Sequence, residues 1–287
     1  MISVSPRDAI LSLLVVAVLL AAGLCLLVYL MQERLIFFPQ RLDERAALAI
    51  QQSYPRAAAF ELVGEDGVRV RGWLVGGPIR RASSLVIYFG GNGEEVSWLV
   101  PEFSRVSDRA ALLMNYRGYG LSDGQPSETM LYQDALALYD RATRRPDIDP
   151  GRIIVMGRSL GTGVATYLAS RRPVAGVVLI SPYDSLVQVA RGAYPFLPVN
   201  LLLRHRFESV ERASSIHAPL LGVVAARDNI VRPERSRALV QAWGGPARLE
   251  VLDGVDHNTI HSHPDYWRLI DAFVAEHTKP IPVAPSQ

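Results

Sequence analysis

The sequence IIVMGRSLGTGVATYL, residues 153–168, decides the fold. Its first four residues are apolar and mostly β-branched, which is typical of a strand buried on both faces, and from Leu160 onward it has the apolar spacing of a helix. Ser159 therefore lies at a turn from strand to helix, between Gly157 and Gly161 in the pattern G-x-S-x-G. Such a turn raises the serine hydroxyl above the edge of a sheet and points the next amide toward the same place. This position makes Ser159 the candidate nucleophile.

A second G-x-S-x-G occurs at residues 120–124, around Ser122. The segment before it contains Gly118 and the segment after it contains Pro126, so neither a strand nor a helix borders this serine. A nucleophile in this kind of turn needs both. We therefore favour Ser159 and keep Ser122 as the alternative.

The rest of the chain repeats this order, with apolar β-branched runs separated by helical patterns. The expected strands are residues 58–63, 68–75, 85–89, 111–115, 153–156, 177–180, 220–225 and 249–252, and the expected helices are 96–109, 127–144, 160–170, 233–243 and 264–277. Most of the later strands show no polar alternation, which indicates a parallel sheet with helices on both faces. The short turn at residues 64–67 predicts an antiparallel hairpin at one edge. The predicted fold class is α/β, with a mostly parallel eight-stranded sheet.

Length and composition fit one folded domain with one membrane segment. Of the 287 residues, 49% are hydrophobic and 20% are charged, which is too apolar for a disordered chain and too charged for a polytopic membrane protein. Lys279 is the only lysine, and because it lies near the C-terminus the chain lacks the lysine of a P-loop. Arginines alternate with acidic residues and cluster only in pairs, which argues against a nucleic-acid partner.

Residues 9–31 contain no charged residue and predict a membrane-spanning helix. About 23 residues at roughly 1.5 Å each reach some 34 Å, enough for a hydrocarbon core of about 30 Å. A cleaved signal peptide is the alternative, because the small residues 21–23 resemble a processing site, but the apolar run continues beyond them. The single cysteine, Cys25, lies in this run, which excludes an internal disulfide and a cysteine nucleophile. We expect a single-pass membrane protein with an N-terminal anchor.

The chain then divides into five segments. They are an N-terminal tail at residues 1–8, the transmembrane helix at 9–31, a juxtamembrane linker at 32–56, the α/β domain at 57–277 and a C-terminal tail at 278–287. The aromatic pair Phe37 and Phe38 suits the interface between membrane and water, where the linker begins.

A serine hydroxyl is a poor nucleophile near neutral pH and needs a base that removes its proton and an acid that orients the base. Asp228 follows the expected strand 220–225 and His257 follows the next strand, so both lie at the carboxyl end of the sheet, where ligands bind. Asp184, which follows the strand 177–180, is the alternative acid. We favour Asp228 because its loop precedes the loop of His257 by one helix.

A metal site is the alternative explanation of His257, because His261 and His263 lie close to it in the sequence. No second group of ligand residues occurs nearby, and the order serine, aspartate, histidine already accounts for His257. We therefore expect no metal. The chain has no Rossmann glycine fingerprint, and hydrolysis at a serine needs only water, so we expect no cofactor.

Several motifs follow one another in one register: IYFGGNG at residues 87–93, NYRGYGLS at 115–122, GRSLGTG at 157–163, SPYDSL at 181–186, and the loops at Asp228 and His257. With these motifs the chain, from about residue 60 to residue 277, resembles the α/β-hydrolase superfamily, in its serine-aminopeptidase-like and monoacylglycerol-lipase-like branch. It looks most similar to the membrane-anchored α/β-hydrolase domain proteins. In such proteins the segment that contains Ser122 is a structural loop beside the site.

The resemblance implies that the backbone amides of Asn92 and Leu160 form an oxyanion hole, which stabilises the negative oxygen of a tetrahedral intermediate. One residue departs from the family pattern. Relatives usually carry histidine where this chain has Gly90, which puts the side-chain packing behind the hole in question.

Residues and resemblance together predict a membrane-anchored serine hydrolase. It would cleave a carboxylic ester or thioester of a lipid-like acyl group through an acyl-enzyme on Ser159, with His257 and Asp228 as base and orienting acid. About 39 residues separate the sixth and seventh expected strands, too few for a large cap domain, and their apolar stretch 194–203 would line an acyl pocket, contact the bilayer or pack as an ordinary short helix. The alternatives are a serine aminopeptidase of the same fold and a catalytically silent hydrolase fold that serves as a binding module at the membrane.

Overall fold

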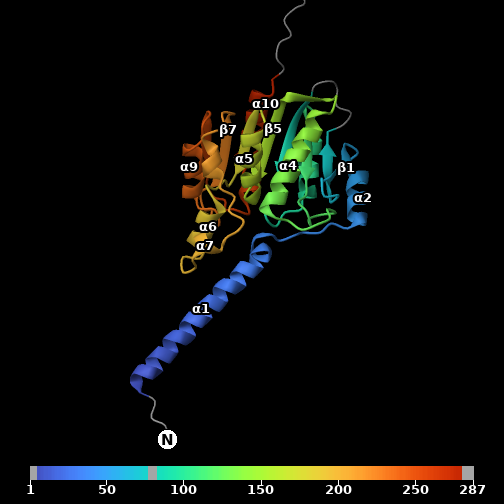
Figure 1. Ribbon diagram of the computed structural model, residues 1–287. Helices are drawn as coiled ribbons and strands as arrows, with labels where there is room; N and C mark the ends of the chain where they lie inside the picture. The colour runs from blue at the N-terminus through green and yellow to red at the C-terminus, as the bar shows by residue number, and fades with distance from the viewer. Residues whose placement is uncertain (1–4, 77–82, 280–287) are drawn as a thin grey trace, which may run out of the picture.

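Eight strands form one sheet in the order β1-β2-β4-β3-β5-β6-β7-β8 in the computed structural model, which describes residues 5–76 and 83–279 (Figure 1). The strands are β1 (Ala57–Val63), β2 (Arg69–Val75), β3 (Ser83–Phe89), β4 (Arg109–Met114), β5 (Ile148–Arg158), β6 (Gly176–Ile180), β7 (Leu220–Ala225) and β8 (Ala247–Leu252). β1 pairs antiparallel with β2, and β2 pairs antiparallel with β4, while the other neighbours are parallel. The predicted fold class, including the hairpin at the edge, is confirmed.

Helices cover both faces of this sheet. One face carries α4 (Glu128–Thr143), α5 (Leu160–Arg171), α8 (Ser209–Ala213) and α9 (Pro233–Gln241), and the other carries η1 (Val96–Leu99), α3 (Val100–Arg105) and α10 (Asp265–His277). Side chains of the central strands point alternately into these two layers: Val155 of β5 packs in the first and Met156 in the second, and both are fully buried. Because neither face meets water, these strands need no polar alternation.

The helix expected at residues 96–109 is wrong at its C-terminal end. α3 ends at Arg105, and Val106 already has extended backbone, with φ −90° and ψ 133°. Arg109 is the first residue of β4, where the following alanines are buried in the sheet. Pairing with β2 and β3 therefore overrides the helical pattern of this short segment.

The N-terminal helix α1 (Pro6–Ile36) has 31 residues and extends from the domain (Figure 1). It begins earlier than the predicted span 9–31 because the Ser5 side chain caps it and Pro6 occupies its first turn. It ends later because its last residues continue along the surface of the domain. By length and composition α1 can cross a membrane, and none of its most apolar stretch is buried within the protein.

Four short helices lie where the sequence showed only a linker and an insert: α2 (Glu44–Ser53), α6 (Leu186–Ala193), α7 (Val199–Leu202) and α8. The carboxylate of Asp43 caps α2 by accepting a hydrogen bond from the amide of Ala46 at 2.7 Å. Residues 278 and 279 are the described part of the expected C-terminal tail. Thr278 is buried and its carbonyl oxygen accepts a hydrogen bond from Arg152 at 2.6 Å, so it is part of the domain. Residues 1–4 and 280–287 of the two expected tails lie outside the described residues.

Candidate active site

Ser159 lies at the turn between β5 and α5, and its backbone is strained. Its φ of 49° and ψ of −117° fall in a region that residues with a side chain rarely occupy. Both flanking glycines are required by close backbone contacts. A Cβ atom on Gly157 would lie 2.3 Å from the carbonyl oxygen of Gly161, and one on Gly161 would lie 2.1 Å from the carbonyl oxygen of Phe89. The turn therefore fixes the direction of the Ser159 side chain, which borders a pocket.

The structure brings Ser159, His257 and Asp228 together. His257 Nε2 is 3.0 Å from Ser159 Oγ, and His257 Nδ1 is 2.7 Å from Asp228 Oδ2. The other carboxylate oxygen of Asp228 accepts hydrogen bonds from the amides of Ile230 and Val231, at 3.0 and 2.8 Å. Both Asp228 and His257 are buried. A carboxylate held in this way favours a proton on Nδ1 of the imidazole, which leaves Nε2 as an acceptor facing the serine.

Three separate loops supply these residues, all at the carboxyl end of the sheet. Ser159 follows β5, Asp228 follows β7 and His257 follows β8. A hydrogen bond from the amide of Arg227 to the carbonyl oxygen of Val255, at 3.4 Å, joins the second loop to the third. Parallel strands present their carboxyl ends at one edge, and this is where open α/β sheets bind ligands.

The two residues that competed with this set have other partners. Asp184 forms an ion pair with Arg235 at 2.9 Å and accepts a hydrogen bond from the amide of Ser185 at 2.8 Å. Burial raises the pKa of the Asp184 carboxyl. Ser122 is fully buried, and its hydroxyl is 2.8 Å from the amide nitrogen of Arg71 and 3.3 Å from the carbonyl oxygen of the same residue. Both side chains are therefore used in structural contacts.

The histidines near His257 in the sequence are also engaged elsewhere. The ring of His261 lies 5.4 Å from the ring of Trp98, and Nδ1 of His263 accepts a hydrogen bond from the amide of Asp265 at 3.1 Å. Within residues 5–76 and 83–279, no three histidine, cysteine, aspartate or glutamate side chains form a group that could hold a metal ion. His261 lies within the turn η2 (Ile260–Ser262), and His263 follows it.

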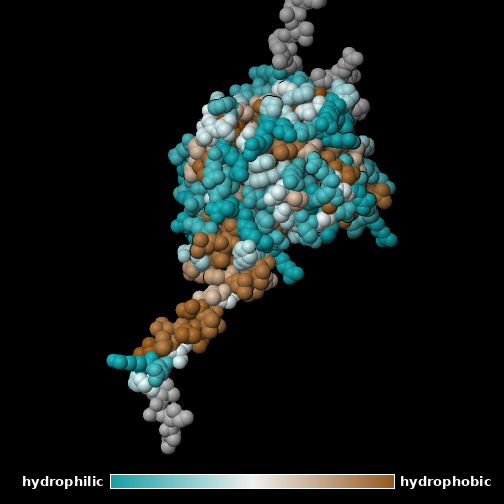
Figure 2. All heavy atoms as spheres, in the orientation of Figure 1, coloured by the Kyte–Doolittle hydropathy of each residue, from teal (hydrophilic) through white to brown (hydrophobic). Residues whose placement is uncertain are grey.

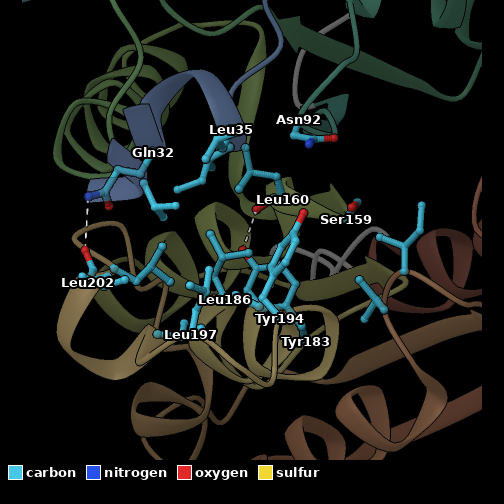
Figure 3. A pocket seen from close by; sticks show the side chains of 17 residues that line it. Gln32, Leu35, Asn92, Ser159, Leu160, Tyr183, Leu186, Tyr194, Leu197 and Leu202 are labelled. Carbon is cyan, nitrogen blue, oxygen red and sulfur yellow. Dashed lines mark hydrogen bonds between the residues drawn. The ribbon is translucent and has the colours of Figure 1, made fainter. Parts of the chain in front are cut away.

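Asn92 and Leu160 border the same pocket as Ser159 (Figure 3). Leu160 is the first residue of α5, so its N–H group has no acceptor within the helix. Asn92 is fixed through its carbonyl oxygen, which accepts hydrogen bonds from the amide of Phe38 at 2.9 Å and from the hydroxyl of Tyr119. Two residues proposed from the resemblance are therefore held beside the serine by different parts of the chain.

No sequence motif marks the buried network behind this turn. Its centre is Glu94, which is 7% exposed. The Glu94 carboxylate accepts hydrogen bonds from the Tyr88 hydroxyl at 2.6 Å, the Gly91 amide at 2.8 Å and the Trp98 indole at 2.9 Å. It also forms an ion pair with Arg158 at 3.1 Å. Burial is the main cause that raises the pKa of Tyr88, which keeps this phenol protonated as a donor to Glu94.

Arg158 extends the network to the histidine loop, because its guanidinium donates a hydrogen bond to the carbonyl oxygen of His257 at 3.2 Å. Glu94 thereby connects the loop that contains Asn92, the residue before Ser159 and the loop of His257. Gly90 is part of this arrangement: a Cβ atom there would lie only 3.2 Å from the Glu94 side chain. The glycine therefore leaves room for Glu94. In this chain the Glu94 side chain fills the space behind the proposed oxyanion hole, where relatives usually carry a histidine at the position of Gly90.

A pocket of about 210 Å³ opens beside Ser159 (Figure 3). Its walls are mostly apolar and come from the end of α1, from the insert that carries α6 and α7, and from the loop after β7. The apolar stretch at residues 194–203 divides between two environments. Tyr194, Leu197 and Leu202 line the pocket, whereas Phe196 and Leu201 are 74% and 83% exposed.

Comparison with known proteins agrees with this architecture. Residues 86–201 match the model of the family described as alpha/beta hydrolase fold. An uncharacterized protein of Mycobacterium tuberculosis is 35% identical over 254 residues, which cover 88% of this chain and 89% of that protein. The alpha/beta hydrolase domain-containing protein WAV2 of Arabidopsis thaliana is 27% identical, with coverage of 77% and 78%.

Among solved structures, the esterase Pf2001 of Pyrococcus furiosus superimposes with a TM-score of 0.63 at 18% identity, covering 85% of this chain and 99% of the esterase. At this identity the likeness shows a shared fold.

Proposed function

The chain belongs to the alpha/beta hydrolase family, and we propose that it is a membrane-anchored serine hydrolase that cleaves a carboxylic ester or thioester of a lipid-like acyl group. Family membership itself supports a hydrolase with a small-molecule substrate. The finer proposal rests on one observation, the continuous line of hydrogen-bond distances from Asp228 through His257 to Ser159.

In the first half of the proposed reaction the Ser159 oxygen attacks the acyl carbon while His257 Nε2 takes the hydroxyl proton. The carbonyl oxygen becomes negative, and the amides of Asn92 and Leu160 stabilise it by hydrogen bonds. His257 then gives its proton to the leaving alcohol or thiol as the carbon–oxygen or carbon–sulfur bond breaks. The product of this half is an acyl group bound as an ester to Ser159.

In the second half, water replaces the leaving group. His257 takes a proton from the water molecule, the resulting nucleophile attacks the acyl-enzyme, and the same proton returns to the Ser159 oxygen as the carboxylic acid leaves. Asp228 holds the imidazole through one carboxylate oxygen and stabilises the imidazolium that forms. The amides of Ile230 and Val231 donate hydrogen bonds to its other carboxylate oxygen and so hold the carboxylate in place.

The anchor in this proposal is α1. It is long enough to cross a bilayer, and none of its most apolar stretch is buried within the protein. The helix also runs without a break through the small residues 21–23, the place considered for signal-peptide processing. We therefore propose that α1 holds the hydrolase domain, residues 57–277, at a membrane surface.

The lining of the pocket supports an acyl ester over an aminoacyl substrate. A free substrate amine would be held by a carboxylate, and among the described residues that line the pocket none is an aspartate or glutamate. The lining includes Leu160, Tyr183 and Leu186, whose side chains suit a hydrocarbon chain (Figure 3).

The test is a comparison of substrates with the full chain in detergent. We expect p-nitrophenyl esters of fatty acids to be hydrolysed and aminoacyl p-nitroanilides to remain intact, with all activity lost in Ser159→Ala. Preferential cleavage of the aminoacyl substrates would assign the protein to the aminopeptidases instead. No turnover of either class by the wild-type protein would favour a binding module without catalysis.

A further inference from the structure

The end of α1 is fixed to the domain by several independent contacts. Gln32, which is 2% exposed, donates a hydrogen bond to the carbonyl oxygen of Leu202 at 3.2 Å and accepts one from the amide of Arg204 at 2.7 Å. The guanidinium of Arg204 lies over the ring of Tyr29 at 5.1 Å and pairs with Glu33 at 3.2 Å. These contacts join the helix to α7 and the residues after it, although Gln32 and Leu202 are 170 positions apart in the sequence.

The side of α1 that meets the domain continues as a wall of the pocket beside Ser159. Cys25, Val28, Gln32 and Ile36 are the less exposed residues of the helix, and their spacing of three or four places them on one face. Three of them, Val28, Gln32 and Ile36, line the pocket together with Leu35. Figure 3 shows Gln32 and Leu35 on the helix, facing Leu202, Leu186 and Tyr194 across the space.

The same helix end also reaches the proposed oxyanion loop. The amide of Phe38 donates a hydrogen bond to the carbonyl oxygen of Asn92 at 2.9 Å. Phe37, next to it, is 3% exposed and contacts the ring of His205 edge to face at 5.3 Å. The position of α1 is thus linked both to the apolar walls of the pocket and to the loop that borders its reactive end.

Around the mouth of the pocket the surface is apolar. Leu35, Phe38 and Tyr194 are 55%, 47% and 53% exposed, and Phe196 and Leu201 are more exposed still. Figure 2 shows hydrophobic atoms on α1 that continue onto the domain where the helix meets α6 and α7. If α1 crosses a bilayer, this surface faces the lipid, because it surrounds the point where the helix joins the domain (Figure 1).

From these contacts we infer that the anchor helix is part of the substrate site: its end forms one wall of the pocket that binds the long acyl chain of an ester embedded in the bilayer. This inference rests on the proposed serine hydrolase function and adds the source of the substrate and the role of α1. The chain enters between α1 and the insert with α6 and α7, with its carboxyl group next to Ser159. Burial in such a pocket stabilises a hydrocarbon chain only if the walls from α1 and from the insert stay in contact with it. The hydrogen bonds of Gln32 hold these two walls together.

The test uses the full chain in phosphatidylcholine vesicles, with p-nitrophenyl palmitate and p-nitrophenyl butyrate as substrates. The measured quantity is the ratio of kcat/KM for palmitate to kcat/KM for butyrate. Leu35→Trp places a large side chain in the wall of the pocket, and we expect this ratio to fall at least about tenfold. Leu30→Trp is the matched control, because Leu30 is 65% exposed, lies on the same helix and is absent from the lining of the pocket. In that variant we expect the ratio to stay within about twofold of the wild type.

A second variant tests the fastening of the helix. Gln32→Leu keeps about the same side-chain size but removes both hydrogen bonds to the insert, and we expect the ratio to fall about threefold to fivefold. Labelling of Ser159 by a soluble fluorophosphonate, measured in every variant, shows that the domain is folded and reactive.

The outcomes separate the two claims. A wild-type protein that cleaves both esters with no preference for palmitate, or equal ratios in Leu35→Trp and Leu30→Trp, overturns the inference and leaves the serine hydrolase in place. A wild-type protein that cleaves neither ester overturns the proposed function, and the inference with it. If the wild-type protein is found to be a dimer and Leu35→Trp a monomer with an unchanged ratio, a second copy of the chain occupies the pocket, which also overturns the inference.

Discussion

Ser122 and Ser159 have the same local sequence pattern and opposite environments. In the turn around Ser122 the left-handed backbone falls on the glycines, with φ of 53° at Gly120 and 80° at Gly124. In the other turn it falls on the serine itself, with φ of 49° at Ser159. Glycine adopts this conformation at no steric cost, whereas a serine held there stores strain.

The side chains differ in the same way. The Ser122 hydroxyl is fully buried between backbone groups of Arg71, while the Ser159 hydroxyl borders a pocket and faces His257. The comparison shows that the pattern specifies a tight turn and that the neighbouring loops determine its use. Strain on the serine, together with a titratable partner, is the feature that distinguishes a candidate nucleophile from a structural residue.

The largest expected difference is between the two alanine substitutions. Ser159→Ala removes the proposed nucleophile, and we expect kcat for a p-nitrophenyl ester to fall by about 10⁶-fold. Ser122→Ala removes only hydrogen bonds to the backbone, so we expect kcat to stay within about twofold and the free energy of unfolding to fall by about 1 kcal/mol. Steady-state kinetics and urea unfolding of both variants measure these quantities. A loss of activity in Ser122→Ala at unchanged stability would reverse the assignment.

The two aspartates provide the next comparison. Asp228→Asn preserves the shape of the side chain but removes the charge that orients His257, and we expect kcat to fall about 10⁴-fold. Asp184→Asn weakens the ion pair with Arg235, which lies outside the hydrogen-bonded line, and we expect kcat to change less than about threefold. Measuring kcat for both proteins decides the matter, and equal losses would mean that Asp184 acts in the reaction.

Buried charge networks lie behind both serine turns. We expect disruption of the network behind Ser159 to lower kcat, and disruption of the network behind Ser122 to lower stability. Glu94→Gln weakens the link between the Asn92 loop, Arg158 and the His257 loop, so we expect kcat to fall about tenfold with KM little changed. Glu102→Gln is the control, because its side chain pairs with Arg105 at the surface. An unchanged kcat in Glu94→Gln would show that the network is purely structural.

Behind the Ser122 turn, buried Arg117 pairs with Asp134 at 2.8 Å and with Asp66. We expect Arg117→Met to lower the free energy of unfolding by about 2 kcal/mol, less than the full cost of breaking a buried pair because Asp66 is half exposed. Its kcat should stay within about twofold of the wild type. Urea unfolding and ester hydrolysis, measured on the same sample, test whether Arg117 contributes to stability without contributing to activity. A large drop in kcat would contradict this.

The smallest predicted effect is at His205, where the end of α1 meets the domain. Burial lowers the pKa of this imidazole, which contacts Phe37 and lies near Glu33, Glu128 and Arg204. Because the unfolded chain binds the proton more readily, the stabilisation is present above the unfolded pKa of about 6.5 and is lost as the pH falls through that range. Both proteins should lose stability between about pH 7 and about pH 5, and we expect His205→Asn to lose less than the wild type. The difference between the two losses should be less than about 1 kcal/mol in the free energy of unfolding, visible as a smaller fall in Tm. An equal fall in Tm over this pH range in the two proteins would contradict this.

Most of the fold could be predicted because the central strands are apolar on both faces and the strands end at turn residues. All eight strands occur close to the expected positions, and the segment around Ser159 has the expected strand, turn and helix. The error at residues 96–109 arose because a short amphipathic segment resembles a helix until pairing in the sheet is known. α2 was missed because its polar, alanine-rich sequence has only one buried residue, Ala47.

The placement of the candidate site residues could be predicted to the extent that these residues follow strands. Strand ends determine where Ser159, Asp228 and His257 lie along the sheet, and their order in the chain then limits the choice of partners. Glu94 and Gln32 could not be found in this way, because their importance comes from contacts with distant loops. Such contacts depend on how the loops pack, which no local pattern records.

The most direct measurement of the central claim is to locate the residue that reacts with a fluorophosphonate probe. The probe transfers its phosphonyl group to an activated serine oxygen as fluoride leaves, and peptide mass spectrometry identifies the modified position. We predict one adduct per chain, on the peptide that contains Ser159, retained in Ser122→Ala and absent in Ser159→Ala and strongly reduced in His257→Ala. An adduct on Ser122, or an unmodified Ser159 in the folded wild-type protein, would contradict the account.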